Sequence, residues 1–484
     1  MPGAAPRAEA PRGARAGRGI GPLSAREAAP AADETAPPAA ARIVATRLPL
    51  IEAAPGRPLP PLPRSAWIEI DLDALVSNAR LLEGSLPSGV RLEAVVKGDA
   101  YGHGAVPVAL ALAGAGVQSL SVATFDEGLE LRQAGIAVPI LVLFPIPPEL
   151  VPHAMRLCLS LTAGDQTLLE RTLAVLDRLD ADAVPADREL PIHLEVETGL
   201  GRGGLHSSDV PAAAAAIEAS PRARLAGLWS HLQAPGDADR TADQAARLGI
   251  ASSLLEEVGM TTPDRHLAAS GGLLAASAPG YDVVRIGLAM YGIVPDGLTV
   301  DERHAAAAAG LKPVLSLRAR PVRVTELAAG TGVSYGPSFV TSRPSRIATL
   351  PLGYADGLPR SLSNKAQVLV RGRRVPAVGT VAMDAVMVDV TDVPGAPVSV
   401  DDEFTLIGTQ GNETIDAVEM ARWGNTISYE IVTAMSGRLP RVYYAAAKAV
   451  QMRTVACDLS WGGGEIGRPG AAASEEETGP LGCE

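Results

Sequence analysis

Polar and charged side chains stand at the ends of several short aliphatic runs, where the neighbouring sequence is mostly apolar. The residues concerned are Lys97, Arg202, His231, Ser270 and Arg285. A lysine in such a place can accept a proton at neutral pH only if burial beside other cations lowers its pKa from about 10.4. Enzymes built on a barrel of parallel strands carry their reacting groups at the C-terminal ends of those strands. These five residues are therefore candidates for an active site, although strand ends also collect polar residues for structural reasons.

The elements that would position them begin at Trp67, where aliphatic runs start to alternate with Ala- and Leu-rich stretches of helical spacing. The runs that predict strands are Trp67–Asp71, Leu92–Lys97, Ser119–Thr124, Pro139–Leu143, Leu157–Leu161, Ile192–Val196, Leu225–His231, His266–Ala269 and Val283–Arg285. The stretches that predict helices include Asp73–Leu82, Gly104–Ala113, Asp126–Gln133 and Asp239–Val258. About eight repeats predict an α/β fold, a (β/α)8 TIM-type barrel over residues 65–302. A doubly wound open sheet would alternate likewise, but no Gly-x-Gly-x-x-Gly follows the first strand.

A second, mostly β domain is predicted over residues 303–455, because helical stretches thin out after Asp301. Its predicted strands are Leu315–Thr325, Arg346–Pro351, Gln367–Val370, Ala385–Val390 and Glu403–Ile407. A helical piece near Asp416–Met420 and a last ordered strand near Arg441–Tyr444 complete this domain.

The two ends of the chain differ from this body. Residues 1–64 are rich in Ala, Pro and Arg and contain no aromatic residue, which predicts a disordered extension. Its arginines superficially resemble a transit peptide, but no apolar signal segment follows. Residues 456–484 predict a disordered tail on similar grounds. The uncharged stretch from Gly104 to Phe125 is long enough to cross a bilayer, but its glycines favour a buried helix, a turn and a strand.

The composition excludes several classes of partner. Lys and Arg number 42 against 54 Asp and Glu, so the net charge is -12, which argues against nucleic acid or acidic membranes as partners. The chain's 3 cysteines are too few and too scattered for a disulfide framework, and no metal site is predicted. A reducing cytoplasm fits this cysteine usage best.

Short motifs around the candidate residues follow one another in a recognisable order. They are Glu69–Leu75, Ala94–Ala105, His193–Arg202, Gly227–His231, His266–Ser270, Val284–Gly292, Val333–Gly336, Leu352–Gly357, Ala382–Asp384 and Ser428–Glu430. The set closely resembles the alanine racemases, which are fold-type III enzymes dependent on pyridoxal 5'-phosphate (PLP). The resemblance spans roughly residues 65 to 450 and covers both predicted domains.

The resemblance implies racemisation by two bases. A weakly acidic α-proton must leave one face of the substrate and another must return to the opposite face, while PLP takes up the electrons. The two bases map to Lys97, which would also hold PLP as a Schiff base, and Tyr335. A phenol with a pKa near 10 needs a nearby positive charge or hydrogen-bond donor to act as a base. The resemblance offers His231, which would bridge Tyr335 to Arg285.

The remaining site residues are also implied by the resemblance. Arg285 is expected to face the pyridine nitrogen of PLP and, because its pKa exceeds about 12, to leave that nitrogen unprotonated. The ring is then a weaker electron sink, which suppresses misprotonation on the cofactor. The PLP phosphate is expected to bind Tyr101, Ser270, Tyr429 and the main-chain N–H groups near Gly287 and Leu288, since bare N–H groups suit a dianion.

Arg202 is expected to reach the phenolic oxygen of PLP and the substrate carboxylate. The main-chain N–H of Met383 would help to hold that carboxylate, Tyr354 would line the entrance, and Arg360 would belong to the surrounding network. The family typically has a Lys, often carbamylated, two residues after the His of the His193 motif, where this sequence has Glu195. We predict that the Glu195 carboxylate pairs with Arg202 in place of the carbamate.

In the resembling enzymes one subunit's barrel and the other's β domain form the active site. We therefore expect a head-to-tail homodimer in which Tyr335 and Met383 act in trans. The implied function is interconversion of L- and D-alanine to supply peptidoglycan synthesis. Ala382, where a Cys is common, could widen the pocket, so a broader racemase acting on serine or another small amino acid stays open. A non-catalytic PLP-binding regulator is the alternative from another class.

Overall fold

The computed structural model describes residues 59–179, 184–185, 188–279, 281–455 and 458–460. Most of the predicted extension (1–64) and tail (456–484) lies outside these residues. Within the predicted extension, Leu59 is buried and packs with Trp67, Val442 and Met452. Within the predicted tail, Asp458–Ser460 form strand β22.

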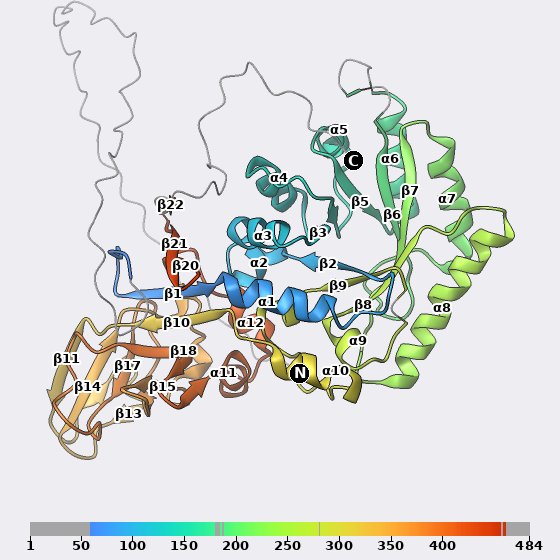
Figure 1. Ribbon diagram of the computed structural model, residues 1–484. Coiled ribbons are helices and arrows are strands. Elements are labelled where there is room, and N and C mark those ends of the chain that lie inside the picture. Colours follow the sequence, from blue (N-terminus) through green and yellow to red (C-terminus); the bar gives the residue numbers. More distant parts are fainter. Residues whose placement is uncertain (1–58, 180–183, 186–187, 280, 456–457, 461–484) are drawn as a thin grey trace, which may run out of the picture. The chain divides into compact units, whose positions relative to one another are not determined.

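The first architectural unit is a closed barrel of parallel strands in the order β2 to β9, as the sequence predicts (Figure 1). The strands are β2 (Arg91–Val95), β3 (Ser119–Val122), β4 (Ile140–Val142), β5 (Leu159–Ala163), β6 (Leu190–Glu195), β7 (Ala223–Trp229), β8 (Asp264–Ala269) and β9 (Val283–Ile286). The helices and short helical turns along this part of the chain are α1 (Leu72–Glu83), α2 (Lys97–Gly102), α3 (Ala105–Gly114), α4 (Phe125–Gln133), η1 (Pro148–Leu150), α5 (Val151–Arg156), α6 (Gln166–Leu176), η2 (Ser207–Asp209), α7 (Val210–Ala219), α8 (Ala238–Glu257), α9 (Ser270–Leu274), η3 (Leu288–Tyr291) and α10 (Glu302–Gly310).

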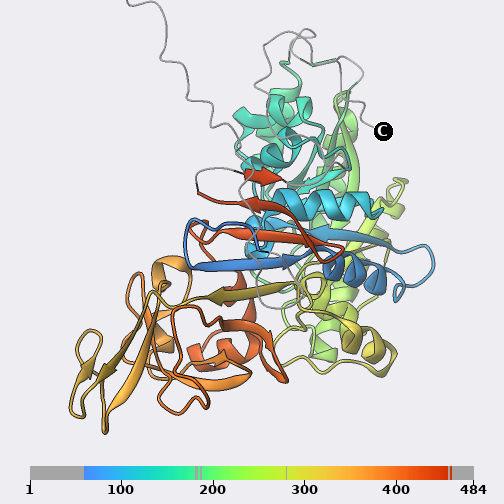
Figure 2. The same cartoon turned by 60° about the vertical axis from the view of Figure 1, so that its left-hand side comes forward.

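The strand predicted over Trp67–Asp71 forms as β1 (Ala66–Asp71), but it does not belong to the barrel. It pairs antiparallel with β10 and parallel with β20, two strands that come after the barrel in the chain (Figures 1 and 2). Its Glu69 forms an ion pair with Arg318 of β10 at 2.9 Å. The barrel therefore begins at β2, and the chain enters it from the second sheet.

The second unit is a mostly β region, as the sequence predicts. Its main sheet has the order β11-β14-β17-β16-β15-β18-β10-β1-β20-β21-β22, with β19 beside β18, and β12 and β13 form a separate hairpin. The strands are β10 (Leu315–Ala319), β11 (Arg323–Leu327), β12 (Gly332–Val333), β13 (Phe339–Val340), β14 (Ser345–Leu350), β15 (Gln367–Val370), β16 (Arg373–Val378), β17 (Val386–Asp389), β18 (Phe404–Gln410), β19 (Glu413–Ile415), β20 (Arg441–Ala445), β21 (Lys448–Arg453) and β22. The helical elements are η4 (Tyr354–Asp356), η5 (Arg360–Leu362), α11 (Ala417–Gly424) and α12 (Ser428–Thr433).

Two predictions for this region were wrong. The run Leu315–Thr325 is not one strand, because Pro321 has no N–H to continue a ladder; β10 pairs with β1 and β18, whereas β11 pairs with β14. The strand near Arg441–Tyr444 is not the last, since β21 pairs with it and β22 pairs with β21.

The uncharged stretch from Gly104 to Phe125 is folded as the helix, turn and strand that its glycines indicate, namely α3 followed by β3. No helix in the described part of the chain is both long and apolar enough to span a bilayer.

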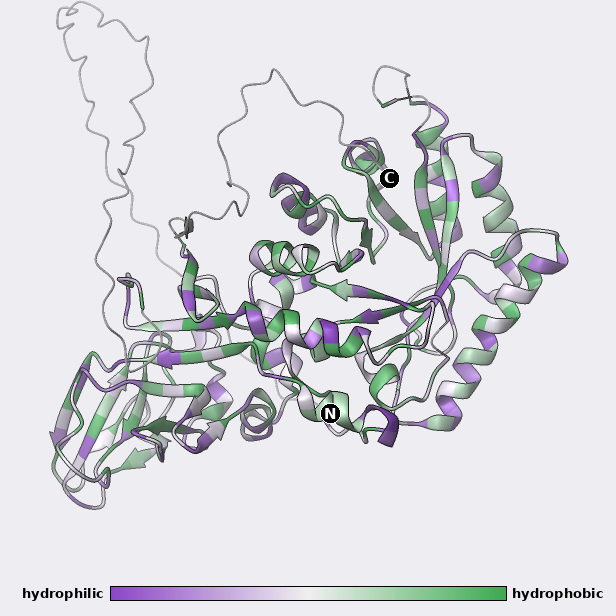
Figure 3. Ribbon diagram, viewed as in Figure 1, coloured by the Kyte–Doolittle hydropathy of each residue, from purple (hydrophilic) through white to green (hydrophobic). Residues whose placement is uncertain are grey.

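Burial follows the apolar pattern of each element. All residues of β4 are buried, as expected for a strand covered on both faces. Along α8, hydrophobic and hydrophilic residues alternate (Figure 3), and Leu248, Ala251 and Leu255 turn toward the barrel core. This packing fixes the ends of the strands, where the candidate residues lie.

Candidate active site

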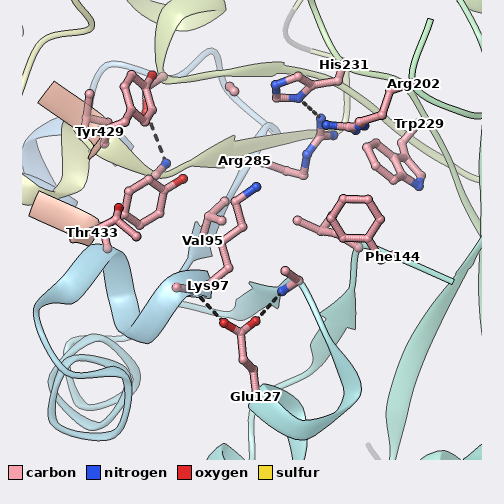
Figure 4. A pocket seen from close by; sticks show the side chains of 18 residues that line it. Val95, Lys97, Glu127, Phe144, Arg202, Trp229, His231, Arg285, Tyr429 and Thr433 are labelled. Atoms are coloured by element: carbon pink, nitrogen blue, oxygen red, sulfur yellow. Dashed lines mark hydrogen bonds between the residues drawn. The ribbon is translucent and has the colours of Figure 1, made fainter. Parts of the chain in front are cut away.

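A cavity of about 500 Å³ opens where the C-terminal ends of the barrel strands meet α12 (Figure 4). It brings together every barrel residue for which the sequence predicts a role at the cofactor, together with Tyr429. The lining residues are Val95, Lys97, Gly98, Tyr101, Ala123, Glu127, Leu143, Phe144, Arg202, Trp229, His231, Ala269, Ser270, Arg285, Gly287, Leu288, Tyr429 and Thr433. A cavity of this size with few, convergent polar groups is typical of a small-molecule site.

Lys97 opens α2 directly after β2 and extends its side chain into the cavity (Figure 4). Burial lowers the pKa of its amine, and the positive charges of Arg202 and Arg285 lower it further, while Glu127 opposes the shift. A larger fraction of the amine is therefore uncharged at neutral pH than on an exposed lysine. An uncharged amine is the form that attacks a carbonyl or accepts a proton.

Arg285 lies at the end of β9, is 2% exposed, and has no carboxylate in direct contact among the described residues. Its guanidinium donates to the Ser230 carbonyl oxygen at 2.7 Å and lies over the Trp229 ring, 4.7 Å from the ring centre. Burial lowers the pKa of Arg285 to about 10, and the charge of Glu93 opposes this. The group thus stays protonated at neutral pH without a direct anionic partner.

The same guanidinium fixes the proton positions of two histidines. Arg285 donates to Nδ1 of His266 at 2.7 Å and faces Nδ1 of His231 at 3.3 Å. Because an arginine only donates, each Nδ1 must be unprotonated and each Nε2 must carry the hydrogen. Burial, followed by the charge of Arg285, lowers the pKa of His231 to about 3, so this imidazole is neutral. His231 thus presents a fixed N–H donor.

Arg202 is held by the predicted carboxylate. Its Nη2 lies 3.1 Å from Oε1 of Glu195, and its guanidinium carbon lies 5.7 Å from the ring centre of Phe144. The side chain of Glu195 is nearly buried and that of Arg202 is partly exposed, so the carboxylate orients the arginine toward the cavity mouth. Glu195 leaves no lysine for carbamylation at this position.

An anion cradle lies beside β9. The hydroxyl of Ser270 accepts hydrogen bonds from the N–H groups of Gly287 and Ala289 at 3.2 and 3.3 Å, so its own hydrogen is available to a ligand. A Cβ on Gly287 would lie 2.3 Å from the Tyr101 hydroxyl oxygen, so only glycine fits there. Burial raises the pKa of Tyr101, and raises that of Tyr429 to about 12, so both phenols keep their hydrogens.

The predicted residues of the β region lie elsewhere. Tyr335, Met383 and Tyr354 do not line the cavity and are 75%, 52% and 44% exposed. Hydrogen bonds connect their loops. The Tyr354 N–H donates to the Ala382 carbonyl oxygen at 3.0 Å, and the Ser334 hydroxyl donates to the Thr380 carbonyl oxygen at 2.6 Å. Arg360, in η5, is also exposed and outside the cavity.

Models of two protein domains match this chain: "Alanine racemase, N-terminal domain" over residues 70–295 and "Alanine racemase, C-terminal domain" over residues 314–443. The alanine racemase of Halothermothrix orenii is 39% identical over 382 residues, covering 78% of this chain and 97% of that protein. The chain belongs to the alanine racemase family.

Other members of the alanine racemase family agree in sequence and in structure. The enzyme of Symbiobacterium thermophilum is 40% identical over 383 residues, covering 78% of this chain and 97% of that protein. The crystal structure of the Bacillus anthracis alanine racemase with bound L-Ala-P is 34% identical, with a TM-score of 0.73 over 81% of this chain and 98% of that one. The crystal structure of the Streptomyces lavendulae alanine racemase is 36% identical, with a TM-score of 0.72, and the match covers 80% of this chain and 98% of that one.

Sequence reasoning missed several residues of the cavity, notably Glu127, Trp229 and Phe144. Glu127 had a visible signal, because Thr124 followed three residues later by a Glu is a capping box at the start of a helix. Trp229 lies inside the motif Gly227–His231. Phe144 follows an apolar run without any distinguishing pattern.

Proposed function

We propose that this family member is a PLP-dependent racemase that interconverts L- and D-alanine. The observation that carries the proposal is a lysine of lowered pKa sharing one cavity with a buried arginine whose direct partners are neutral. An arginine opposite the pyridine nitrogen suits racemisation, whereas enzymes that need a strong electron sink place a carboxylate there.

The residues of the cavity fit PLP. Lys97 would bind its aldehyde carbon, and the cradle of Ser270 and Gly287 would bind its phosphate with the phenols of Tyr101 and Tyr429. A side chain at Gly287 would crowd the Tyr101 hydroxyl, and the hydroxyl hydrogen of Ser270, which accepts from the Gly287 and Ala289 N–H groups, is left to donate to a phosphate. When bound, PLP takes up the electron pair that remains when the α-carbon of an amino acid loses its proton.

The protein's own residues would move the protons. Lys97 would take or return the α-proton on one face of the substrate, and Tyr335 would do so on the other. The fixed Nε2–H of His231 would stabilise the phenolate of Tyr335. Arg202, oriented by Glu195, would bind the substrate carboxylate, with the N–H of Met383 as a second donor.

Because Tyr335 is exposed and lies outside the cavity of its own chain, we propose a homodimer in which each cavity receives Tyr335, Tyr354 and Met383 from the other subunit. Three exposed side chains on loops that hydrogen-bond to one another form a surface suited to such docking. Supply of D-alanine for peptidoglycan and a cytoplasmic location complete the proposal; cell fractionation tests the location.

The deciding experiment follows exchange of the α-proton of alanine in deuterated water with PLP present. We expect exchange and racemisation in the native chain, and loss of both in Lys97→Ala. Tyr335→Phe should exchange the α-proton of one enantiomer only and form almost none of the other. If the protein binds PLP but exchanges no α-proton, a non-catalytic PLP-binding regulator is the better interpretation. If serine is racemised as fast as alanine, the protein is a racemase of broader specificity.

A further inference from the structure

The segment that follows Lys97 has an unusual backbone. Gly98, Asp99, Ala100 and Tyr101 all adopt left-handed helical angles, with φ between 53° and 65°. Three of these residues carry a Cβ, which crowds the following carbonyl oxygen in this conformation. Such a turn persists only where its surroundings hold it.

Contacts from several elements hold the turn. Its first N–H, that of Gly98, donates to Oε1 of Glu127 in α4 at 2.6 Å. Oδ1 of Asp99 accepts from the Ala105 N–H at 2.8 Å and from Arg453 of β21 at 2.7 Å. At the far end, the buried Arg441 donates through Nε to the Gly102 carbonyl oxygen at 3.0 Å. Of these contacts, the one from Glu127 acts on the residue that follows Lys97.

The Glu127 carboxylate makes one contact more than its position in the helix requires. Oε2 accepts from the N–H groups of Ala123 and Thr124 at 2.7 and 3.2 Å, which closes the capping box of α4. Oε1 is then free of the cap and reaches across to Gly98, so one side chain joins the loops after β2 and β3 (Figure 4). The carboxylate also lines the cavity beneath Lys97.

We propose that Glu127 is a positioning residue for Lys97, which it serves by anchoring the left-handed turn through the Gly98 N–H. Lys97 needs such an anchor because its amine has no hydrogen bond or ion pair with any described residue, so no polar contact of the amine determines where it enters the cavity. The inference deepens the proposed function and rests on it, since it concerns the lysine that would bind PLP. The opposing effect of Glu127 on the lowered pKa of Lys97 fits this placement.

Three variants separate anchoring from capping. Glu127→Asp keeps the charge near the cap but is too short to reach Gly98. Glu127→Gln keeps the length, but its single amide oxygen can accept at Gly98 or at the cap and not at both. Glu127→Ala removes both contacts. Asp165→Ala is the matched control, since Asp165 caps α6 through the Leu168 N–H at 2.8 Å and does not line the cavity.

The first measurement is the dissociation constant of PLP, from titration of the apoprotein followed by tryptophan fluorescence. Loss of a hydrogen bond to a charged acceptor should weaken binding about tenfold in Glu127→Asp and Glu127→Ala. We expect a change of about twofold in Glu127→Gln, and none in Asp165→Ala. In the loaded enzyme, Glu127→Asp should lower kcat more than it changes KM for alanine.

The second measurement needs neither PLP nor turnover. The chain has only four lysines, so the labelling rate of Lys97 by an amine-reactive reagent can be read by mass spectrometry against the exposed Lys365. Glu127→Asp and Glu127→Ala should change the Lys97 rate at least threefold, whereas Asp165→Ala should not.

The outcomes decide between the two roles. If Glu127→Asp and Glu127→Ala bind PLP as tightly as Asp165→Ala, and the reagent labels their Lys97 at the native rate, Glu127 is only a helix cap and the inference is overturned. Should a variant lose fold, thermal unfolding will show it, and Glu127→Asp, which retains a carboxylate at the helix start, then carries the test. A native chain that binds no PLP would refute the proposed function instead, and Lys97 labelling would still decide the role of Glu127.

Discussion

Two inactive variants of this protein should restore activity to each other when mixed. Lys97 lies in the barrel cavity, whereas Tyr335 is 75% exposed on the β region and absent from that cavity. If each site combines Lys97 of one chain with Tyr335 of the other, Lys97→Ala and Tyr335→Phe damage different halves of the site. A mixed dimer then has one doubly damaged site and one intact site.

The size of the recovery follows from this geometry. Random assembly of equal amounts gives about one half mixed dimers, each with one of its two sites intact, so activity should reach about a quarter of the native value. Each variant alone should lose at least about a hundredfold, the usual effect of removing a general base. The recovered signal therefore exceeds the background by more than an order of magnitude.

The assay is racemisation of alanine after co-refolding the two variants, or with mixed dimers purified through two different tags. Lys97→Ala mixed with His231→Gln is the matched control, because both residues line the same barrel cavity and neither site of the mixed dimer would be intact. No recovery in the first mixture, or equal recovery in both, would show that Tyr335 does not act across subunits.

Other parts of the site make further predictions. Gly287→Ala should weaken PLP binding more than about tenfold because its Cβ would lie 2.3 Å from the Tyr101 hydroxyl oxygen, whereas Gly114→Ala, which meets no atom within 4 Å, should bind normally in the same titration. Glu195→Gln should raise KM for alanine about fivefold, since a partly exposed ion pair with Arg202 is worth up to about 1 kcal/mol; activity that depends on bicarbonate would contradict the role of Glu195. Acid should destabilise the fold, because buried histidines that are neutral in the folded chain take up protons on unfolding. Their pKa is lowered from 6.5 in the folded chain, so below pH 6.5 protonation favours the unfolded state. At about pH 5.5 the free energy of unfolding should fall by about 1.4 kcal/mol per histidine. The histidines concerned are His103, His193 and His231. A urea midpoint that stays constant from about pH 7.5 to 5.5 would exclude this effect.

The barrel could be predicted because a parallel strand buried on both faces is a continuous aliphatic run, and several such runs here end near a polar residue. The membership of β1 could not be predicted from its apolar content alone. Its alternation of Ile68, Glu69 and Ile70 held a signal, since Glu69 meets Arg318 on a neighbouring antiparallel strand. Pairing partners hundreds of residues apart leave no mark in the local sequence.

The site residues that could be predicted are those whose side-chain type alone determines what they can do chemically, such as Lys97, Arg202 and Arg285. The sequence could not show that Tyr335 is exposed or that Glu127 reaches Gly98, because both depend on how separate loops meet. Nor could it show that no carboxylate of the described residues contacts Arg285 directly, since that depends on which strands neighbour β9. These are tertiary facts, and the proposed roles of these residues stay predictions.

The burial of Arg285 gives a physical reason for a phenol that must work as a base. Its guanidinium donates to Nδ1 of His231 and thereby leaves the hydrogen on Nε2. Since burial lowers the pKa of His231 to about 3, the imidazole can donate a hydrogen bond at neutral pH but cannot protonate the oxygen it meets. A partner's Tyr335 that docks there would meet a donor backed by a positive charge, which favours phenolate. Replacing Arg285 by glutamine removes that charge, so it should slow proton transfer by Tyr335, and the loss of rate caused by Arg285→Gln should be smaller in a Tyr335→Phe background.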